Sequence, residues 1–482
     1  MYLPERVYVK PQSRNDPVTA EIIRRVHAID PKIPIIQMRG QSIPFPSHST
    51  AVWRWRQRRK SIILSQRTVP FMSTFASPGN IVERLGVILN LCWHCPSDCH
   101  FCYLQPVLPP DQILYTNLEK LDREVAIEPY VHKAVLTIWS LISFVLKEEL
   151  RRIPVNFHKA ANYVRAEFLS EGVNNDTEAV EFLEDILRRR NSPLLKIMQG
   201  GKPAQHGSKD DKRRVWSKKP MDLGFKAKDL KTSRRTLSGY YVKNSTYPLR
   251  LNPSEFTDLI AYDHLCGYTK RLMDLVARHP EIDISLRTKS SYVDEMILCD
   301  GLDRVISVMN FNTPFVIEHY EPGTASLEER LIAAQKVQDA KGFRLGIVIE
   351  PMIKYPGYQK DYVELARRIM TSLDGRRVED ISLGCVRYSG KLEARVKRNF
   401  PMTDLFDDSQ ELLALEKHDR RRYPLDERVQ LYRLVFDEFR KHTKAFFRLG
   451  AETPDAWEGL GLERTSLMQK SVYQYPGRQG KP

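Results

Sequence analysis

Apolar and polar positions follow a regular rhythm over the C-terminal half of the chain. Short apolar runs of strand length alternate with longer segments in which apolar residues recur at the 3.6-residue period of a helix. A capping-box pair, Ser326 with Glu329, begins the clearest helix, and Gly342 supplies its C-terminal stop. The predicted strands lie at 283–287, 304–309, 343–353 and 380–386, and the predicted helices at 263–278, 326–340, 362–373 and 425–442. Strands separated by single helices predict right-handed crossovers, and therefore a mostly parallel sheet or barrel.

The first 60 residues show a different pattern. Two extended segments, 6–10 and 33–38, flank a helix-like run at 17–27. The region ends in WRWRQRRKS at 53–61, where aromatic and guanidinium side chains alternate. This mixture suits phosphate contact and base stacking. A strand with one basic, solvated face is the alternative interpretation.

The rhythm is lost between about residues 118 and 240. An amphipathic helix is predicted at 179–190, and the stretch 200–236 combines a Gly-Gly pair and prolines with a dense basic run. Such composition is typical of a partly disordered segment, and it could hold a polyanion. We therefore predict three regions: an N-terminal α/β region at 1–84, a central α/β unit at 85–400 with a basic insertion, and a C-terminal helical region and tail at 401–482.

Composition narrows the class of protein. The 482 residues are 42% hydrophobic and 10% aromatic, as in ordinary globular proteins, and carry a formal net charge of +15. This charge favours a polyanionic partner, and nucleic acid is preferred over an anionic membrane surface. A generally basic, solvated surface would give the same net charge. The N-terminus lacks a signal-peptide pattern, and the longest largely apolar run, 134–146, is too short to cross a bilayer. We expect a cytoplasmic protein, without a membrane partner, whose reduced cysteines serve metal or redox chemistry.

Four of the seven cysteines lie within eleven residues of LCWHCPSDCHFCYLQ, at 91–105. The apolar run 85–91 leads into them, so the cysteines are expected on a loop at the C-terminal end of a strand. A structural zinc site usually needs a second pair of ligands further along the chain, and a ferredoxin cluster follows a different spacing. Zinc binding and simple electron transfer are therefore the less favoured alternatives.

The nested spacing Cys95-x3-Cys99-x2-Cys102 is the more informative pattern, with Cys92 as an extra, packed thiol. Three thiolates on a [4Fe–4S] cluster leave one iron open, and an open iron can bind S-adenosylmethionine and cleave it reductively to a 5′-deoxyadenosyl radical. This spacing resembles the radical-SAM signature, and its position after a strand agrees with it.

The loop CPSDCHFCYLQ more narrowly resembles that of the spore photoproduct lyase family, and further segments agree with that family in the same order. These segments are LPERVYVKP at 3–11, FTDLIAYDHL at 256–265, LRTKS at 286–290, the stretch 315–338, LGIVIEPMI at 345–353, and VRYSGKLEARVKRNFPMTDL at 386–405. The resemblance implies a partial (β/α)6 radical-SAM barrel with an N-terminal α/β extension and a helical and basic insertion. It also implies an enzyme that repairs a thymine photoproduct in DNA: the adenosyl radical removes a hydrogen from C6 of the lesion, and the bond between the thymines then breaks.

Roles for individual residues follow from the same resemblance. It implies that the three cysteines of the nested motif ligate the [4Fe–4S] cluster, and that Asp258 and Arg387 contact the substrate. Tyr103 is expected both to contact S-adenosylmethionine and to take part in catalysis. The other expected contacts to S-adenosylmethionine are Thr257, Lys289 and Ser307, of which Ser307 is the weakest match because the local length differs after it. DNA and a reductant such as flavodoxin or ferredoxin are the expected partners of a monomeric enzyme.

Two positions depart from the family pattern. The cysteine that returns a hydrogen atom to the product radical is replaced by Glu255, and the relay tyrosine before the last cluster cysteine is replaced by Phe101. A carboxyl O–H bond is too strong to donate a hydrogen atom easily. Another thiol, with Cys385 as the best candidate, could substitute; the enzyme could act on a different nucleobase or modified thymine; or the protein could bind nucleic acid without catalysis.

Overall fold

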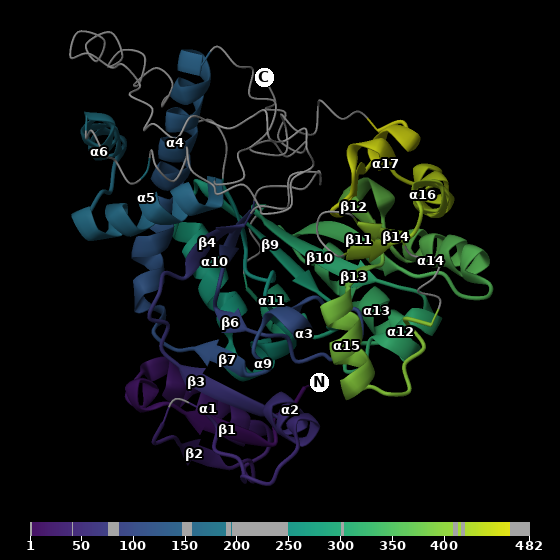
Figure 1. The fold of residues 1–482 in the computed structure, drawn as a ribbon, viewed down its shortest axis with the longest axis horizontal. Helices are drawn as coiled ribbons and strands as arrows, with labels where there is room; N and C mark the ends of the chain where they lie inside the picture. Colours follow the sequence, from purple (N-terminus) through teal and green to yellow (C-terminus); the bar gives the residue numbers. More distant parts are fainter. Residues whose placement is uncertain are drawn as a thin grey trace.

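The computed structural model describes residues 2–40, 42–75, 86–146, 157–188, 194, 249–299, 303–407, 413–415 and 420–462. The basic stretch predicted at 200–236 and the C-terminal tail lie outside the described residues. The fold is a mixed α/β arrangement built on two largely parallel sheets (Figure 1).

The smaller of these sheets has five strands in the order β2-β1-β3-β7-β6. Its strands are β1 Arg6–Val9, β2 Ile35–Gln37, β3 Ser61–Ser65, β6 Cys92–Trp93 and β7 Gln112–Tyr115, and helix α1 spans Pro17–Ile29. The strands β1, β2, β3 and β7 run parallel, and β6 joins β7 in the antiparallel direction. The extended and helical segments predicted for the first 40 residues are thus confirmed. The sheet also joins strands from both sides of residue 84, so the predicted regional boundary there stays a prediction.

The alternating segment WRWRQRRKS is mainly helical, so the strand interpretation of it was wrong. Helix α2 spans Ala51–Arg59, and β3 begins directly after Lys60. The helix starts where it does because the Thr50 side chain accepts a hydrogen bond from the Trp53 amide at 3.1 Å. In a helix, residues four positions apart share a face. Trp55 and Arg59 are consequently both buried, while Arg54 and Arg56, on either side of Trp55 in the sequence, are exposed.

The larger sheet has eight strands in the order β16-β12-β11-β10-β9-β8-β5-β4. Its strands are β4 Met72–Phe75, β5 Gly86–Leu89, β8 Leu249–Asn252, β9 Ile282–Thr288, β10 Val305–Phe311, β11 Arg344–Met352, β12 Val378–Cys385 and β16 Phe446–Leu449. All neighbouring pairs are parallel except β4 with β5. The four strands predicted from the apolar runs are therefore confirmed, each within two residues of its predicted ends.

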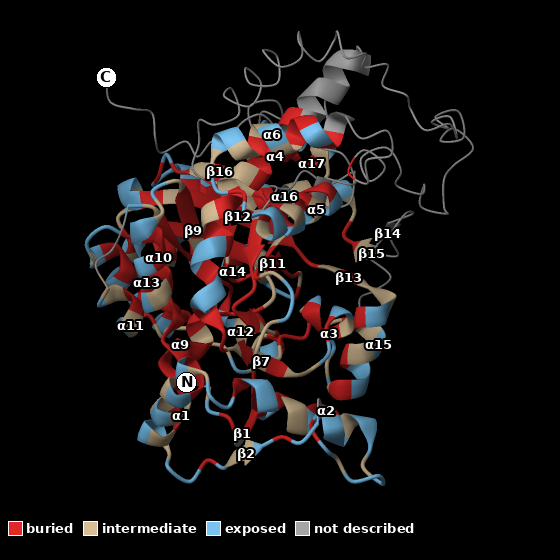
Figure 2. Cartoon of the chain, turned by 90° about the vertical axis from the view of Figure 1, so that its left-hand side faces the viewer, coloured by how far each residue is buried: buried red, intermediate tan, exposed pale blue. Residues whose placement is uncertain are grey.

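Consecutive strands of the larger sheet are spatial neighbours, which places the connecting helices on one face of the sheet. These helices are α10 Tyr268–Arg278, α11 Asp294–Ile297, α12 Pro314–Tyr320, α13 Leu327–Asp339, α14 Tyr358–Ser372 and α16 Leu425–Arg440. The main hydrophobic core lies between the helices and this face (Figure 2). The opposite face of the central strands has only a small apolar cluster: Ile306, Val308 and Val348. The predicted capping box is confirmed at the start of α13, where Ser326 and Glu329 bond reciprocally.

Three helices pack into a separate core beside the larger sheet. They are α4 Leu121–Leu146, α5 Phe157–Glu171 and α6 Asp176–Arg188, and α6 confirms the amphipathic helix predicted there. A fully buried ion pair between Arg165 and Glu128 joins α5 to α4, with Nη2 2.5 Å from Oε1. The apolar run 134–146 forms part of α4. Within the described residues, no helix has the combination of length and apolar composition needed to span a membrane.

The remaining elements border the carboxyl ends of the larger sheet. They are α3 Leu104–Val107, α9 Asp263–Cys266, α15 Gly390–Asn399, α17 Pro454–Gly459, and an antiparallel sheet of β13 Arg387–Ser389, β15 Arg420–Arg422 and β14 Leu413–Leu415. The single helix predicted at 263–278 is wrong, because the chain breaks into α9 and α10 at Gly267. That glycine has a φ of +60°, a conformation that costs little only without a Cβ.

Asp263 stabilises this break. Its carboxylate accepts hydrogen bonds from the Thr269 amide at 2.9 Å and from the Thr269 hydroxyl. Burial raises the pKa of Asp263 to about 6 despite these bonds, from an ordinary value of 3.8. The neighbouring His264 ring bonds to the Tyr2 carbonyl at 2.7 Å.

The raised pKa predicts that Asp263 makes folding pH-dependent. A buried carboxyl with a raised pKa binds its proton more tightly in the folded state, so its contribution to stability is complete below about pH 4 and is lost as pH rises through about 6. Asp263→Asn should remove this contribution, worth roughly 2–3 kcal/mol from a shift of about two pKa units. Urea unfolding at pH 4.5 and 7.5 measures it. If the stability difference between the two pH values is the same in variant and parent, Asp263 is not responsible.

Candidate active site

The residues predicted to carry chemistry gather at one edge of the larger sheet. Strand β5 leads into the cysteine loop, β8 into Glu255–Asp258, and β9 ends at Thr288, just before Lys289. Strand β11 carries Glu350 near its end, and β12 is followed by Arg387. The carboxyl ends of parallel strands meet at the same edge, where α/β proteins place their catalytic and ligand-binding groups. The predicted location of the cysteine loop is therefore confirmed.

The three cysteines of the nested motif lie together and away from water. Burial raises the pKa of Cys95 to about 12 and raises those of Cys99 and Cys102. The thiols are close enough to affect one another electrostatically, and the cations Lys289 and Arg59 oppose the increase. Cys92 is fully buried in the main core, as predicted for a packed extra thiol.

Arg59 anchors one side of the cysteine loop. Its side chain is only 4% exposed and contacts four groups of the loop. Nε donates to Asp98 Oδ1 at 2.6 Å, Nη1 to His94 Nδ1 at 2.8 Å, and Nη2 to the carbonyls of Ser97, at 3.0 Å, and Cys95. A planar guanidinium satisfies several acceptors in fixed directions at once. The end of α2 thus fixes the conformation of the loop.

His94 joins this anchor to the segment after β8. It has a φ of +69°, unusual for a residue with a side chain, and its carbonyl accepts a hydrogen bond from Thr257 Oγ1 at 2.9 Å. Burial and the Arg59 charge lower the pKa of the His94 imidazole to about 3. The ring is therefore neutral, and its Nδ1 accepts the hydrogen bond from Arg59. Thr257, predicted to contact S-adenosylmethionine, lies directly against the cysteine loop.

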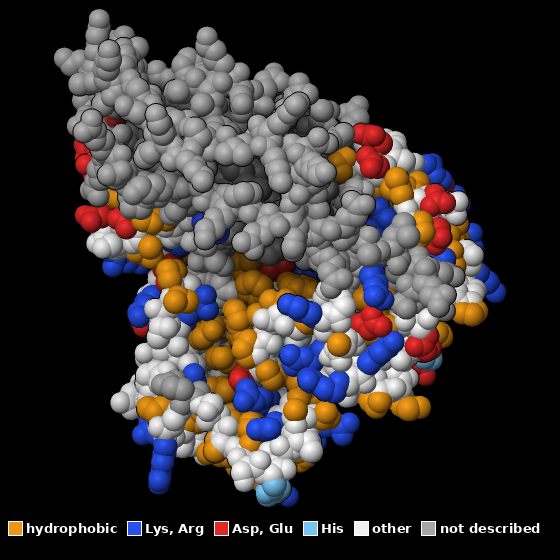
Figure 3. Space-filling model, viewed as in Figure 1, with side chains coloured by type: hydrophobic (Ala, Val, Ile, Leu, Met, Phe, Trp, Pro, Cys, Tyr) orange, Lys and Arg blue, Asp and Glu red, His pale blue; other side chains and the backbone are white. Residues whose placement is uncertain are grey.

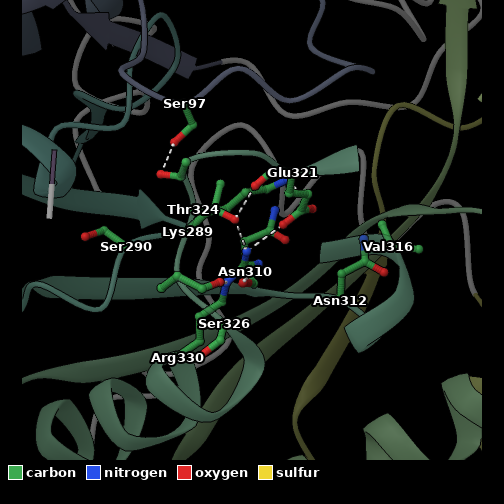
Figure 4. A network of polar contacts seen from close by, with 12 residues as sticks. Ser97, Lys289, Ser290, Asn310, Asn312, Val316, Glu321, Thr324, Ser326 and Arg330 are labelled. Carbon is green, nitrogen blue, oxygen red and sulfur yellow. Dashed lines mark hydrogen bonds and ion pairs between the residues drawn. The ribbon is translucent and has the colours of Figure 1, made fainter. Parts of the chain in front are cut away.

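The connection between α12 and α13 holds the other side of the loop. The Asp98 amide donates to the Pro322 carbonyl at 3.0 Å, and the His100 amide donates to the Tyr320 carbonyl at 2.9 Å. The Ser97 hydroxyl donates to the Gly323 carbonyl at 3.1 Å (Figure 4). The loop is therefore clamped between two elements that are far apart in sequence, which restricts the positions of its thiols.

A buried carboxylate, Glu321, lies at the centre of the network in Figure 4. Glu321 is 1% exposed and binds two cations: Lys289 Nζ is 2.6 Å from Oε1, and Arg330 Nη2 is 2.6 Å from Oε2. Burial opposes ionisation, but the two cations keep the pKa of Glu321 below its ordinary value. Burial likewise opposes the charge on Lys289, but Glu321 and Cys99 raise its pKa. Glu321 and Lys289 therefore each favour the charged form of the other.

Lys289 lies beside the cysteine loop, with its ammonium 4.4 Å from the centre of the Phe101 ring. Its backbone amide donates to Asp258 Oδ2 at 2.8 Å, and Asp258 Oδ1 accepts from the Thr288 hydroxyl at 2.8 Å. Burial raises the pKa of Asp258, although these bonds favour its anion. Asp258, predicted to contact the substrate, therefore holds the backbone that carries Lys289.

The hydroxyl of Tyr103 contacts Glu255, the residue that stands where the family pattern has a cysteine. The Tyr103 hydroxyl donates to the Glu255 carbonyl at 2.8 Å and to its carboxylate Oε1 at 2.9 Å. The Tyr103 residue is 45% exposed overall. Desolvation of the hydroxyl and the neighbouring carboxylate raise the pKa of Tyr103 well above its ordinary value. Glu255, which replaces the cysteine expected from the family pattern, thus orients Tyr103, the residue after the last cysteine of the motif.

Arg387 belongs to a second charged group at the same edge of the sheet. Its Nη2 is 3.1 Å from Glu350 Oε1, and its Nη1 donates to the Gly450 carbonyl at 3.0 Å. Arg287 approaches the other oxygen of Glu350 at 3.9 Å. Burial opposes the charge on Glu350, but Arg387, Arg287 and Arg448 lower its pKa. With exposed fractions of 40% and 25%, the Arg287 and Arg387 side chains remain partly open to solvent.

Two predicted site residues lie on the other side of the larger sheet. Successive side chains of a strand point to opposite faces, and Ser307 shares its face with Val305 and Met309, which belong to the core under the helices. Ser307 is fully buried, with Oγ 3.8 Å from Met309 Sδ. Cys385 is also buried in that core, and its amide donates to the Tyr432 hydroxyl of α16 at 2.8 Å. The structure does not bring either residue together with the cysteine loop.

The chemistry of the loop suits an iron–sulfur cluster. Three buried thiols next to two cations can ionise when metal displaces their protons, and the cations compensate the negative charge that results. Over the ranges that the structure describes, no three Cys, His, Asp or Glu side chains stand close enough together to hold a single ion. Thiolates that ligate a cluster bind separate iron atoms and are therefore spaced more widely than the ligands of one zinc ion.

The sequence did not identify Arg59, His94 or Glu321 as site residues. Arg59 was interpreted as part of a basic surface, although its four-residue spacing from Trp55 indicates a shared buried face once the segment is recognised as helical. Glu321 lies in a connection without periodic pattern. Only the fold reveals that its partners are Lys289 and Arg330.

Comparison with known proteins gives one consistent family. Residues 236–442 match the family model described as spore photoproduct lyase. The curated spore photoproduct lyase of a Geobacillus species is 27% identical over 151 residues, 31% of this chain and 44% of the relative. That of Bacillus subtilis is 26% identical over 158 residues, 32% of this chain and 46% of the relative. The alignments thus span less than half the length of these curated relatives.

Solved structures agree over a much larger part of the chain. A spore photoproduct lyase with a cysteine-to-alanine mutation and bound dinucleoside spore photoproduct superposes with a TM-score of 0.60 and 17% identity, covering 93% of this chain and 99% of that one. A double mutant with bound AdoMet and the same dinucleoside has a TM-score of 0.58 and 18% identity, covering 93% and 98%. At these identities the superpositions establish the similarity of fold.

Proposed function

Because the chain is a divergent member of the spore photoproduct lyase family, we propose that it is a radical-SAM enzyme acting on a thymine photoproduct in DNA. The observation that carries this proposal is the clamped loop, in which the buried Cys99 and the half-buried Cys95 and Cys102 lie together beside Lys289. These cysteines would hold a [4Fe–4S] cluster. The curated relatives match over less than half of their length, so activity, substrate and partners are all part of the proposal.

We infer that the larger sheet is a partial (β/α)6 barrel of the radical-SAM kind. The order β5-β8-β9-β10-β11-β12 follows the chain order, with every pair parallel. Helices on one face alone leave the other face free to curve around a ligand. A Cβ on Gly384 would lie 2.8 Å from the Glu350 carboxylate, so the Glu350 side chain of β11 packs directly over the backbone of β12 on that inner face.

When bound, the cluster and S-adenosylmethionine would together supply a 5′-deoxyadenosyl radical. The residues of the chain would position the nucleotide around it. Lys289 would offer its ammonium to the methionine carboxylate while Glu321 fixes its direction, since an ammonium has three donors and Glu321 accepts from one of them. Tyr103 belongs to the same loop, and Thr257 donates to its His94 carbonyl. Arg387 and Arg287 would face a substrate phosphate or base at the second charged group.

The contact between Tyr103 and Glu255 favours a second candidate function. A carboxylate at this position cannot return a hydrogen atom as a thiol does, and the substitute thiol predicted at Cys385 is buried on the helix-covered face. An enzyme of the same kind that acts on a different nucleobase or a modified thymine would not need that thiol. A non-catalytic nucleic-acid-binding protein is the third reading from the sequence, and iron content after reconstitution distinguishes it, because zinc in place of iron would favour it.

The partners and location stay as predicted from the sequence. DNA is the proposed macromolecular substrate, and a flavodoxin or ferredoxin is the proposed electron donor. We propose a monomeric cytoplasmic enzyme.

Anaerobic reconstitution with iron and sulfide, followed by incubation with S-adenosylmethionine and dithionite, tests the proposed function. We expect formation of 5′-deoxyadenosine, measured by chromatography, and conversion of a dinucleoside spore photoproduct to two thymidines. If 5′-deoxyadenosine forms but the photoproduct persists, the second candidate function is supported. If no 5′-deoxyadenosine forms from protein that has bound four irons per chain, as expected for one cluster, the enzyme proposal is wrong.

A further inference from the structure

Helices α2 and α15 together present a positively charged surface. They meet through the Trp55 and Phe400 rings, whose centres are 5.4 Å apart. Figure 3 shows Lys and Arg side chains gathered over the part of the molecule where Figure 1 places these two helices. We call this the α2–α15 surface; its cations are Arg54, Arg56, Lys391, Arg395 and Arg398.

Most of these cations lack an acidic partner. Neighbouring cations on the same helices are paired: Arg58 with Asp111 at 2.7 Å, and Lys397 with Glu393 at 3.0 Å. By contrast, among the residues that the structure describes, no carboxylate lies within ion-pair distance of the five cations of the α2–α15 surface. Burial and the adjacent Arg398 charge lower the pKa of Arg395. Like charges held side by side without compensation favour the binding of an anion.

The α2–α15 surface lies directly beside the cysteine loop. Arg59, at the end of α2, binds the loop, and the Phe400 ring stacks on His100 of the loop with centres 4.4 Å apart. A ligand on this surface would therefore be positioned relative to the candidate active site.

The exposed side chains fit a nucleic-acid backbone better than a membrane. A helix that lies on a bilayer must insert an apolar face. The apolar faces of α2 and α15 are largely used in the core, because Trp55, Leu392 and Val396 are 7%, 2% and 0% exposed. The exposed tryptophan of α2, Trp53, packs edge-on against Phe45, with ring centres 6.0 Å apart. Arg guanidinium groups bind phosphate oxygens in a bidentate manner, and duplex DNA carries about one negative charge per 1.7 Å of its axis.

We propose that the α2–α15 surface binds the phosphate backbone of the duplex DNA that carries the substrate base. This inference rests on the proposed function, and it names the surface by which the enzyme holds its partner. The salt dependence of DNA binding would reveal these phosphate contacts, because each contact contributes about 0.9 to the slope of log affinity against log salt.

The experiment compares three forms of the full-length protein by fluorescence anisotropy with a labelled duplex oligonucleotide. The test variant replaces Arg54, Arg56, Arg395 and Arg398 with Gln. A charge-matched variant replaces the same four with Lys. The control variant replaces Lys270, Lys341 and Lys360 with Gln. These three lysines are exposed and lie on the outer helices or next to them. Circular dichroism and 5′-deoxyadenosine formation without DNA verify that each variant is folded and loaded.

We expect the Gln variant to lose roughly 10- to 100-fold in affinity at low salt, with a slope smaller by about two to four. The Lys and control variants should retain slopes close to the parent. A Gln variant with the parent slope overturns the inference and leaves the proposed function standing. Binding of the parent to phosphatidylserine vesicles that the Gln variant loses, with duplex binding unchanged, also overturns it. If the parent itself shows no salt-dependent binding to DNA, the proposed DNA substrate is wrong.

Discussion

Cys99→Ala is expected to abolish cluster binding and, with it, all cleavage of S-adenosylmethionine. Cys99 is 7% exposed, and the hydrogen bonds that hold the loop to Arg59 and to the connection between α12 and α13 restrict the movement of another side chain into its place. Losing one of three thiolates leaves a cluster with too few protein ligands. Two measurements test this after anaerobic reconstitution: iron per chain, and 5′-deoxyadenosine formed with dithionite. Both should fall to the level of a mixture without protein.

Cys299→Ala is the matched control for this experiment. Cys299 is partly buried outside the loop, and its Sγ donates a hydrogen bond to the Glu295 carbonyl at 3.5 Å. This variant should keep both iron and activity. Full iron content in the Cys99 variant would contradict the assignment of Cys99 as a cluster ligand.

Glu321→Ala is expected to lower the free energy of unfolding by about 3–5 kcal/mol, because it leaves two buried cations without their counter-ion. Lys289 and Arg330 both bind the Glu321 carboxylate at 2.6 Å, and Arg330 is fully buried. Urea unfolding followed by circular dichroism measures the loss. The same variant should bind S-adenosylmethionine more weakly, since Lys289 would no longer be held beside the cysteine loop.

Glu318→Ala, in the last turn of the preceding helix α12, provides the control. Glu318 is exposed, one turn before Glu321, and its removal should change stability by less than about 0.5 kcal/mol. If Glu321→Ala is as mild as Glu318→Ala, the buried network does not hold this part of the fold together.

The sequence predicted the larger sheet well because its strands and helices each carry a strong local pattern. Strand β11 is buried on both faces, and its nearly continuous apolar run predicts such a strand. The cysteine loop was equally predictable, because ligand spacing along the chain is a local property. Helix α2 was missed because Arg and Trp alternate there with a period of two, while the Thr50 cap and the buried pair Trp55 and Arg59 determine a helix.

The arrangement of the site depends on contacts that no local pattern contains. Glu321 and Lys289 are 32 residues apart, and Arg59 lies 39 residues before Asp98. Ser307 was matched by resemblance, but the face of a strand residue changes with a shift of one position. The side chain of Ser307 consequently faces the helix-covered core, whereas the side chains of its neighbours Ile306 and Val308 lie on the inner face of the sheet.

The pairing of β3 with β7 has a consequence for how the chain tolerates shortening. These strands run parallel across the boundary between the first region and the rest of the molecule. A chain beginning at residue 85 would leave β7 with an open hydrogen-bonding edge, and open edges of this kind promote aggregation between copies. It would also lack Arg59, so Asp98 and the loop carbonyls would lose their common donor. The first 65 residues therefore complete the smaller sheet and supply the arginine that holds the cysteine loop, and they should be retained whenever the protein is produced.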